Sequence, residues 1–393
     1  MKRLFLSFCI LTCAVTMQAQ EPLIDPNDSI SSLLERVFPH SNPNLSAHMN
    51  LQFSTSADAN FTEGKLDDAA FKMNRIRWEL LGNFNKRFAY HFRQSFNKYS
   101  NPHALDNLSS SVEMAYVDWK MSDLFTLSVG KRDVVFGGYE YYVAPIKVRE
   151  FSEFNNYVNC YQAGVTGTMH LSPTQELVLQ VVNNRSGEDK DTYVYGLPAG
   201  VEKAKVPILS TVNWNGFFFD RAVQLRYAAS WGQLADNKNV YYLTAGNIYE
   251  KGPVVAYVDL MYSREGLDSK GIISDMQMGD TYTPVTAQNA EYFTLIANYD
   301  YRIHSHWNVY VKGAYETASI YKSNGMFEKG LYRTTWNAQA CVEFFPMKNS
   351  ELLIYGHFLY KGHQLTGRAK ELGAATPNTQ RVSVGLVYTI PVF

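Results

Sequence analysis

The chain has 393 residues, of which 46% are hydrophobic and 14% are aromatic. Its 36 Lys and Arg residues almost balance 37 Asp and Glu residues, which argues against a protein dedicated to binding nucleic acid. Beyond the first 19 residues the only cysteines are Cys160 and Cys341. The sequence therefore contains no disulfide framework, and we expect both thiols to be free.

The N-terminus has the pattern of a secretory signal peptide, predicted to span residues 1–19. Two basic residues precede an apolar run from Leu4 to Val15, and Ala19 is the expected cleavage residue. Residues 20–44 contain a short helical pattern that stops before a proline. We expect them to form a short periplasmic segment, because they are too few for the plug domain of a large transporter.

From residue 45 onward the sequence has the pattern of β-strands. In residues 45–55, LSAHMNLQFST, apolar and polar side chains alternate and so fall on opposite faces. Most such segments approach the roughly 9 to 11 residues with which a tilted strand crosses a bilayer. The predicted strands are 45–55, 71–84, 88–96, 111–119, 124–132, 160–171, 176–184, 207–218, 222–232, 239–250, 254–263, 290–301, 307–319, 332–345, 351–361 and 380–393.

Short and longer connections alternate between these strands. Seven connections have three to five residues, as in NKR and KGP, and the other eight have 6 to 27 residues. This alternation is typical of an up-and-down membrane barrel with periplasmic turns and external loops. The expected fold is thus all-β, a transmembrane antiparallel up-and-down β-barrel of about 16 strands over residues 45–393. Pairing of the last strand with the first would remove the open edges that lipid does not tolerate.

The apolar strand faces combine aliphatic centres with aromatic residues towards the ends. Aromatic girdles at the two membrane interfaces would produce this composition. A secreted β-sandwich with aromatic residues in its core is the alternative interpretation. The clearest examples are Phe88, Tyr90 and Phe92; Val223, Leu225, Tyr227 and Trp231; and Phe293, Leu295, Ala297, Tyr299 and Tyr301.

The longest connection, residues 133–159, does not alternate and is dense in aromatic and charged residues. A connection of this length inside a compact domain is usually functional or disordered. Its charges have both signs: Lys147 and Arg149, and Glu140, Glu150 and Glu153. An ordinary surface loop is the alternative.

Several stretches resemble the phosphate-selective porin O and P family of outer-membrane channels. They are FKMNRIRWELLGNF (71–84), FAYHFRQSF (88–96), VEMAYVDWK (112–120), LSVGKRDVVFGGYEYY (127–142) and AGVTG (163–167). The resemblance implies a trimeric channel of 16 strands whose third external loop, here residues 133–159, folds inward and constricts the pore. This chain has Ile76 between Arg75 and Arg77, where the family tends to carry adjacent arginines. Phe393 matches the terminal aromatic residue of outer-membrane porins.

If the apolar faces contact lipid, the opposite faces bring charged residues into the lumen. Guanidinium groups can pass an oxyanion by bidentate contacts, and rings of like charge select ions in pores. A solvated wall of mixed charge without solute preference is the alternative. The predicted anion path consists of Arg75, Arg77, Arg93, Arg132, Lys147, Arg149, Arg226, Lys312, Arg333 and Arg381. The acidic residues expected in the lumen are Glu79, Glu113, Glu176, Asp259, Glu316 and Glu343.

The predicted function is passive diffusion of small hydrophilic solutes, with anions such as phosphate as the preferred class. The expected setting is the lipid of a Gram-negative outer membrane, and the resemblance implies a homotrimer. The alternative is a barrel with a closed pore that anchors or binds another protein, for which the loops 185–206 and 264–289 are long enough.

The sequence predicts no catalytic residues, no cofactor and no metal site. His91 and Ser95 share a strand face, but four residues of strand separate them by about 13 Å, too far for direct proton transfer. The nine histidines have no metal-ligand spacing.

Overall fold

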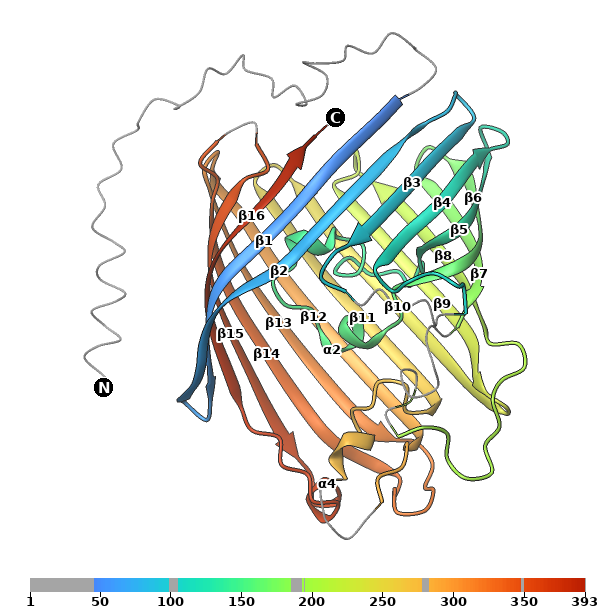
Figure 1. Cartoon of the computed structure of the whole chain (residues 1–393), viewed down its shortest axis with the longest axis vertical. Coiled ribbons are helices and arrows are strands. Elements are labelled where there is room, and N and C mark those ends of the chain that lie inside the picture. The colour runs from blue at the N-terminus through green and yellow to red at the C-terminus, as the bar shows by residue number, and fades with distance from the viewer. Residues whose placement is uncertain are drawn as a thin grey trace, which may run out of the picture.

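The computed structural model describes residues 46–98, 105–184, 193, 195–277, 283–347 and 350–392. These residues form a closed barrel in which each strand pairs antiparallel with its neighbours in sequence, and the last strand pairs with the first (Figure 1). The strands are β1 (Ser46–Thr62), β2 (Lys65–Asn83), β3 (Phe88–Ser95), β4 (Val112–Lys120), β5 (Phe125–Asp133), β6 (Tyr161–Ser172), β7 (Gln175–Asn183), β8 (Ile208–Phe218), β9 (Val223–Ala235), β10 (Lys238–Lys251), β11 (Val254–Leu267), β12 (Gln288–His304), β13 (Trp307–Ile320), β14 (Gly330–Phe344), β15 (Leu353–Leu365) and β16 (Thr379–Pro391). The predicted all-β, antiparallel up-and-down barrel of 16 strands is confirmed.

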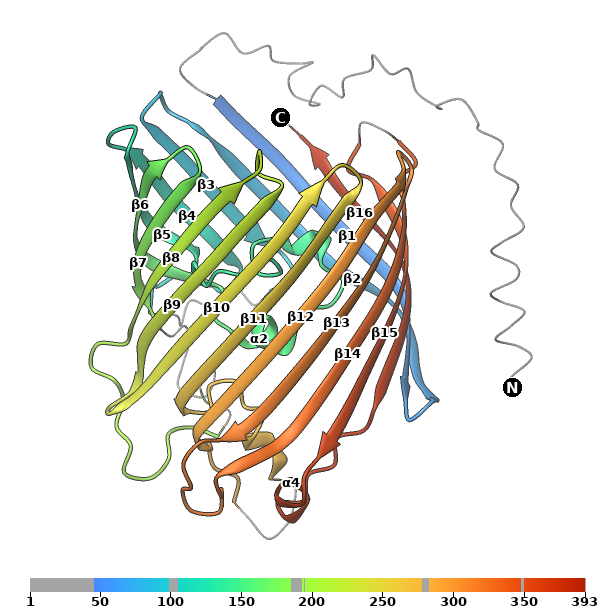
Figure 2. The same ribbon diagram turned by 180° about the vertical axis from the view of Figure 1, so that it is seen from behind.

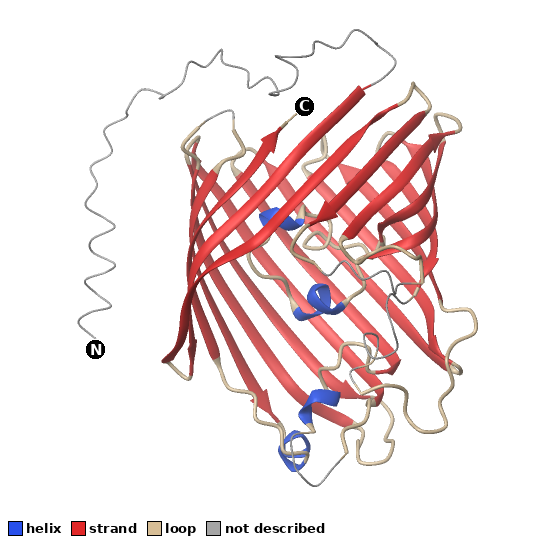
Figure 3. Ribbon diagram, viewed as in Figure 1, coloured by secondary structure: helices blue, strands red, loops and turns tan. Residues whose placement is uncertain are grey.

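Short helices occur in the connections and are blue in Figure 3. They are η1 (Pro145–Lys147), α2 (Glu153–Tyr157), η2 (Ser274–Met276) and α4 (Gly367–Glu371). Among the described residues, no helix is long and apolar enough to cross a membrane. The predicted signal peptide (1–19), the N-terminal segment (20–44) and Phe393 lie outside the described residues.

Two connections that the sequence predicts as longer loops are instead two-residue turns. Residues 56–70 were expected to be a loop, but β1 and β2 continue through them and turn at Glu63 and Gly64, whose φ angles are 49° and 78°. Between β9 and β10 only Asp236 and Asn237 remain, where six residues were expected. The alternation of short and long connections is therefore less strict than predicted. The first part of β2 is exposed on both faces, so it lacks the apolar face on which the prediction depended.

The two faces of the wall differ as alternation requires. Along β9 and β10, Trp231 and Leu243 point outward and are about half exposed, whereas Ser230 and Thr244 point inward and are buried. The start of β1 and the end of β16 lie at the same end of the barrel, beside the tight turns (Figure 1). Cys160 and Cys341 are free thiols.

The segment that joins β5 to β6, residues 134–160, packs against inward side chains of other strands. Its Phe136 and Phe154 share a buried apolar cluster with Tyr242 on β10, Met261 on β11 and residues of β7–β13. The helix α2 of this segment is seen within the ring of strands in both Figure 1 and Figure 2. Part of the barrel interior is therefore filled by a hydrophobic core. The cavities of the interior lie mainly beside strands that do not contribute to this core.

Candidate functional site

Three cations surround one buried carboxylate on the inner face of β2–β4. Nη2 of Arg77 lies 2.7 Å from Oε2 of Glu113, and Nε of Arg93 lies 3.1 Å from the same oxygen. Lys98 contributes Nζ at 2.9 Å from the other oxygen. Glu79 adds a second carboxylate, 3.7 Å from Nη1 of Arg93. We call Arg77, Arg93, Lys98 and Glu113 the arginine cluster; its cations outnumber its carboxylate.

Strand register creates the arginine cluster. Residues two apart on a strand share a face, so Arg77 and Glu79 both point inward from β2. Glu79 is directly opposite Arg93 across the β2–β3 pair. A register shift just after Arg93 in the β3–β4 pair accompanies the approach of Glu113 to the same group.

Two guanidinium nitrogens of the arginine cluster retain unused donors. Within the described part of the chain, Nε of Arg77 and Nη2 of Arg93 are buried and have no hydrogen-bond partner. A buried donor without a partner costs free energy, which an anion or water can recover. The ion pairs of the cluster therefore leave two buried guanidinium donors unused.

On the opposite side of the barrel, the 134–160 segment is fixed through its carboxylates. Glu140 is fully buried and accepts hydrogen bonds from Nζ of Lys312 at 2.7 Å and from Oγ of Ser152 at 2.7 Å. Burial raises the pKa of Glu140, but Lys312 and the hydrogen bonds outweigh it and hold the pKa below its ordinary value. Asp259 on β11 accepts from the backbone N–H groups of Tyr139 and Glu140.

The other two carboxylates of this segment also face the strands at the end of the chain. Glu150 lies 2.7 Å from Nη2 of Arg381 on β16 and pairs with Lys361 on β15. Glu153 receives two hydrogen bonds from Nη2 of Arg333 on β14, at 2.6 and 2.7 Å. All three glutamates of the segment therefore form ion pairs with cations of β13–β16.

The two cations of the same segment have different surroundings. Arg149 pairs with Glu343 on β14 at 3.1 Å, and its guanidinium lies 4.3 Å from the ring centroid of Tyr355. Lys147 is exposed and, among the described residues, makes no ion pair. Arg75 on β2 is likewise without an ion pair in the described part of the chain.

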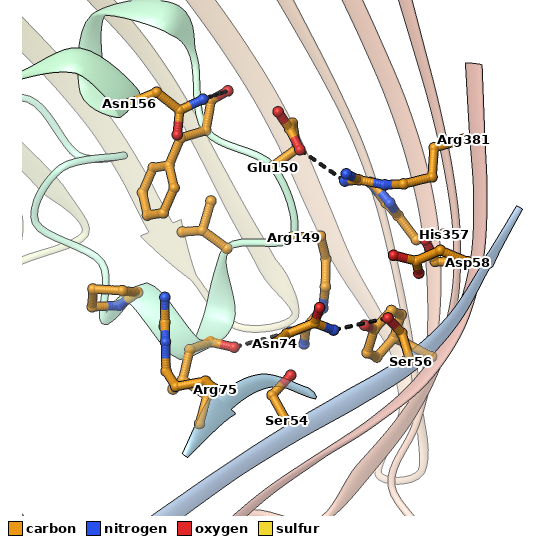
Figure 4. A pocket seen from close by; sticks show the side chains of 16 residues that line it. Ser54, Ser56, Asp58, Asn74, Arg75, Arg149, Glu150, Asn156, His357 and Arg381 are labelled. Carbon is orange, nitrogen blue, oxygen red and sulfur yellow. Dashed lines mark hydrogen bonds and ion pairs between the residues drawn. The ribbon is translucent and has the colours of Figure 1, made fainter. Parts of the chain in front are cut away.

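Two cavities adjoin the segment. The larger has a volume of about 1100 Å³ and lies beside β2–β9, whereas the smaller has about 210 Å³ and lies beside β1, β2, β15 and β16. Figure 4 shows the smaller cavity, with Arg75 and Arg381 on different sides and Glu150 directed to Arg381. Arg75 and Asn74 line both cavities, so the two spaces adjoin along β2.

The larger cavity has a strong excess of positive charge. Its acidic lining residues are Glu113, Asp133 and Glu176. Its cationic lining residues are Arg75, Arg77, Arg93, Lys98, Arg132, Lys147, Arg221 and Arg226. Among the described residues, eight cations thus face three carboxylates, because the glutamates of the 134–160 segment are directed to the other wall.

Six of the ten cations predicted from the sequence line the larger cavity. They are Arg75, Arg77, Arg93, Arg132, Lys147 and Arg226. Arg149 and Arg381 line the smaller cavity. Lys312 and Arg333 lie on the inner wall, where they are held by Glu140 and Glu153.

The sequence reasoning missed Lys98 and Arg221. Both residues lie in connections, where the alternation of a strand gives no direction to a side chain. It also missed the aromatic support of Arg226, whose guanidinium lies 3.4 Å from the ring centroid of Tyr142, and of Arg221, 3.7 Å from that of Phe217. Stacking of this kind holds a guanidinium in place while its edge stays free for an anion.

Comparisons with known proteins agree with this architecture. The family model described as phosphate-selective porin O and P matches residues 47–390. No curated protein sequence matches the chain.

Similar solved structures share the fold at low sequence identity. The outer membrane channel DcaP of Acinetobacter baumannii has 12% identity and a TM-score of 0.62, and the match covers 89% of this chain and 98% of that one. An anion-selective porin from Comamonas acidovorans has 9% identity and a TM-score of 0.58, with 88% and 99% covered. OmpT of Vibrio cholerae in its trimer form has 10% identity and a TM-score of 0.56, with 88% and 99% covered.

The family match extends over nearly the whole barrel, and both it and the fold point to a channel rather than an enzyme. The chain therefore belongs to the phosphate-selective porin O and P family and is a porin of the Gram-negative outer membrane.

Proposed function

We propose that this porin passes small hydrophilic anions, phosphate among them, through the larger cavity. The observation that carries the proposal is the separation of charge inside the barrel. Of the described residues, eight cations and three carboxylates line the larger cavity, whereas Glu140, Glu150 and Glu153 are paired with cations on the opposite wall. An anion in the open space therefore meets mainly positive side chains.

The partial pairing of these cations suits conduction. A pore must attract its solute without holding it, so that the solute can leave. Arg77 and Arg93 share Glu113, which reduces their net field without removing the excess of positive charge. Arg75 and Lys147, which make no ion pair among the described residues, would supply the less compensated charge at the junction of the two cavities.

We further propose that the 134–160 segment is the external loop that sets the width of the path. Its contacts with β11–β16 support this role, since they fix it across the interior. A signal peptide at residues 1–19, a periplasmic segment at 20–44 and a homotrimer complete the proposal. The trimer is supported by the likeness to OmpT, which is described in a trimer form.

The apolar cluster in the barrel interior favours a second candidate function. Seventeen buried residues, Phe136 and Phe154 among them, occupy space against β7–β13. A closed barrel that anchors another protein would also have a filled interior. The two functions differ in conduction, because only a porin passes current by itself.

Single-channel current across a planar bilayer under a salt gradient tests the proposal. We expect a conducting pore whose reversal potential favours chloride and whose current is reduced by added phosphate. The double variant Arg75→Gln with Lys147→Gln should shift the reversal potential towards zero without loss of conduction. Conduction without ion preference would make the protein a general porin, and absence of conduction in folded protein would support the closed barrel.

A further inference from the structure

The outer wall of the barrel has a groove that the channel function does not use. It has a volume of about 800 Å³ and crosses β7–β11, which form part of the near wall in Figure 2. Its outward lining is mainly apolar: Leu179, Val212, Ala229, Trp231 and Leu243.

Strand pairing explains the shape of the groove. Ala229 on β9 is directly opposite Val212 on one side and Leu243 on the other. A small side chain between two larger ones leaves a depression in the outer surface of the barrel at this point. One step closer to the long connections, Trp231 is opposite Tyr241, and this aromatic pair raises the wall again. The groove can therefore hold a chain-like apolar group.

A cation closes the groove at its long-connection end. Arg264 on β11 lines the groove and is directly opposite Tyr241, and its guanidinium lies 3.9 Å from the ring centroid of Tyr321. Glu291, opposite Arg264 on β12, accepts a hydrogen bond from the hydroxyl of Tyr262. In the described part of the chain Arg264 makes no ion pair.

We propose that this groove binds a phosphorylated glycolipid of the outer leaflet. An acyl chain lies over Ala229, and a phosphate of the headgroup contacts Arg264. Arg264 is stacked on Tyr321 and beside Tyr241 at the level where an aromatic belt meets headgroups. The long-connection end of the barrel is the external end in the proposed orientation, which places the phosphate in the outer leaflet.

Charge complementarity distinguishes this groove from a second one on the same wall. The second groove, of about 690 Å³, crosses β9–β14, and its lining includes small residues such as Ala297, Gly313 and Ala338. Lys312, its one cationic lining residue in the described part of the chain, is directed inward to Glu140. The second groove offers an acyl chain a similar apolar surface but no cation for a phosphate. Any membrane lipid can therefore cover it, and no specific headgroup is required.

Native mass spectrometry of the purified, folded protein in detergent tests the proposal, with diphosphorylated lipid A as the probe. We expect one tightly bound lipid A per chain, and roughly tenfold weaker binding in Arg264→Gln because a charge-assisted contact is lost. Arg302→Gln is the control for loss of a ring-stacked arginine away from the groove. Arg302 stacks on the ring of Phe345 at 3.7 Å, lies at the tight-turn end and has the parity of the inward residues of β12.

A second pair of variants tests the acyl chain separately. Ala229→Trp should fill the groove and lower lipid A binding while Arg264 is intact, whereas Ala338→Trp in the second groove should leave binding unchanged. Heat-dependent gel mobility reports that each variant is folded. Equal binding by Arg264→Gln and the parent protein, or an equal loss in Arg302→Gln, would overturn the proposal. Equal competition by phosphatidylglycerol would overturn the assignment to a glycolipid.

Discussion

Nζ of Lys312, in the middle of β13, lies 2.7 Å from Oε1 of Glu140, which belongs to the connection between β5 and β6. Both groups are almost completely buried, and the carboxylate also receives hydrogen bonds from Ser152 and Asn155. One ion pair thus joins two parts of the chain that are far apart in sequence. Its position makes it the first contact to alter when the role of the 134–160 segment is studied.

Replacement of this cation should loosen the segment. Lys312→Met leaves the Glu140 carboxylate buried without its charge partner, and loss of one member of a buried pair typically costs about 3 to 5 kcal/mol. We expect noisier single-channel current and a lower unfolding temperature. The double variant Lys312→Met with Glu140→Gln should recover part of both, because it removes the unpaired charge. If the double variant is the sum of the two single ones, the pair does not act as a unit.

Acid should release the part of the segment that is held by Glu150. Burial raises the pKa of Glu150, but Lys361 and Arg381 outweigh this effect and the pKa is lowered overall. The stabilisation is therefore fully present above the ordinary carboxylate pKa of about 4.3 and is lost as the pH falls through the lowered value. Current noise recorded from pH 7 down to pH 3 should increase at the acid end.

The variant Glu150→Gln is the control for this acid effect. It should be noisier than the parent protein at pH 7 and should respond less to acid. An acid response of the same size in Glu150→Gln would assign the effect to another carboxylate.

Removal of the shared carboxylate should strengthen the preference for anions. Glu113→Gln leaves Arg77, Arg93 and Lys98 without their nearest negative charge. We expect a reversal potential further towards that of chloride and a block by lower phosphate concentrations, together with a loss of about 3 to 5 kcal/mol in stability. Glu176→Gln is the comparison: Glu176 also lines the cavity, and within the described residues its one ion pair is with His170. Equal shifts in both variants would contradict a special role for the arginine cluster.

The apolar side of the 134–160 segment should contribute measurable stability. Phe154 is 1% exposed, and its ring centroid lies 5.6 Å from that of Tyr242. Phe154→Ala should cost about 3 to 5 kcal/mol in unfolding free energy, because it leaves a cavity in the core. Tyr157→Ala, in the same helix but at a half-exposed residue, should change stability by about 0.5 kcal/mol or less. Denaturant unfolding followed by tryptophan fluorescence measures both.

The strands were predictable because lipid imposes one rule on every membrane-facing residue. Alternation such as that of residues 45–55 is the direct result, and each predicted strand has a counterpart in the barrel. The rule does not apply to the parts of strands that extend beyond the lipid. The β1–β2 hairpin lies in a stretch that the sequence predicts as a loop, although Glu63 followed by Gly64 is a polar–glycine pair that suits a two-residue hairpin turn, and both φ angles are positive.

The charged interior was predictable only in part. The sequence places Arg75, Arg77 and Arg93 among the cations of the lumen, and Glu79 and Glu113 among its carboxylates, without saying which of them pair. The structure makes Glu113 the closer counterion, because the register shift between β3 and β4 changes which side chains meet. The partners of Glu140, Glu150 and Glu153 could not be derived, since a connection without regular backbone gives no rule for side-chain direction.

The apolar cluster shared by Phe136, Phe154 and the inner faces of β7–β13 has a consequence for redesign. Excision of an obstructing loop is an obvious way to widen a pore. Here excision would uncover Tyr242, Met261 and Ile296 to water on one side while lipid covers the other face of the same strands. The wall would then be apolar on both its inner and its outer surface, and the barrel would be prone to collapse or aggregation. A wider version of this porin requires polar replacements on the inner wall as well as a shorter loop.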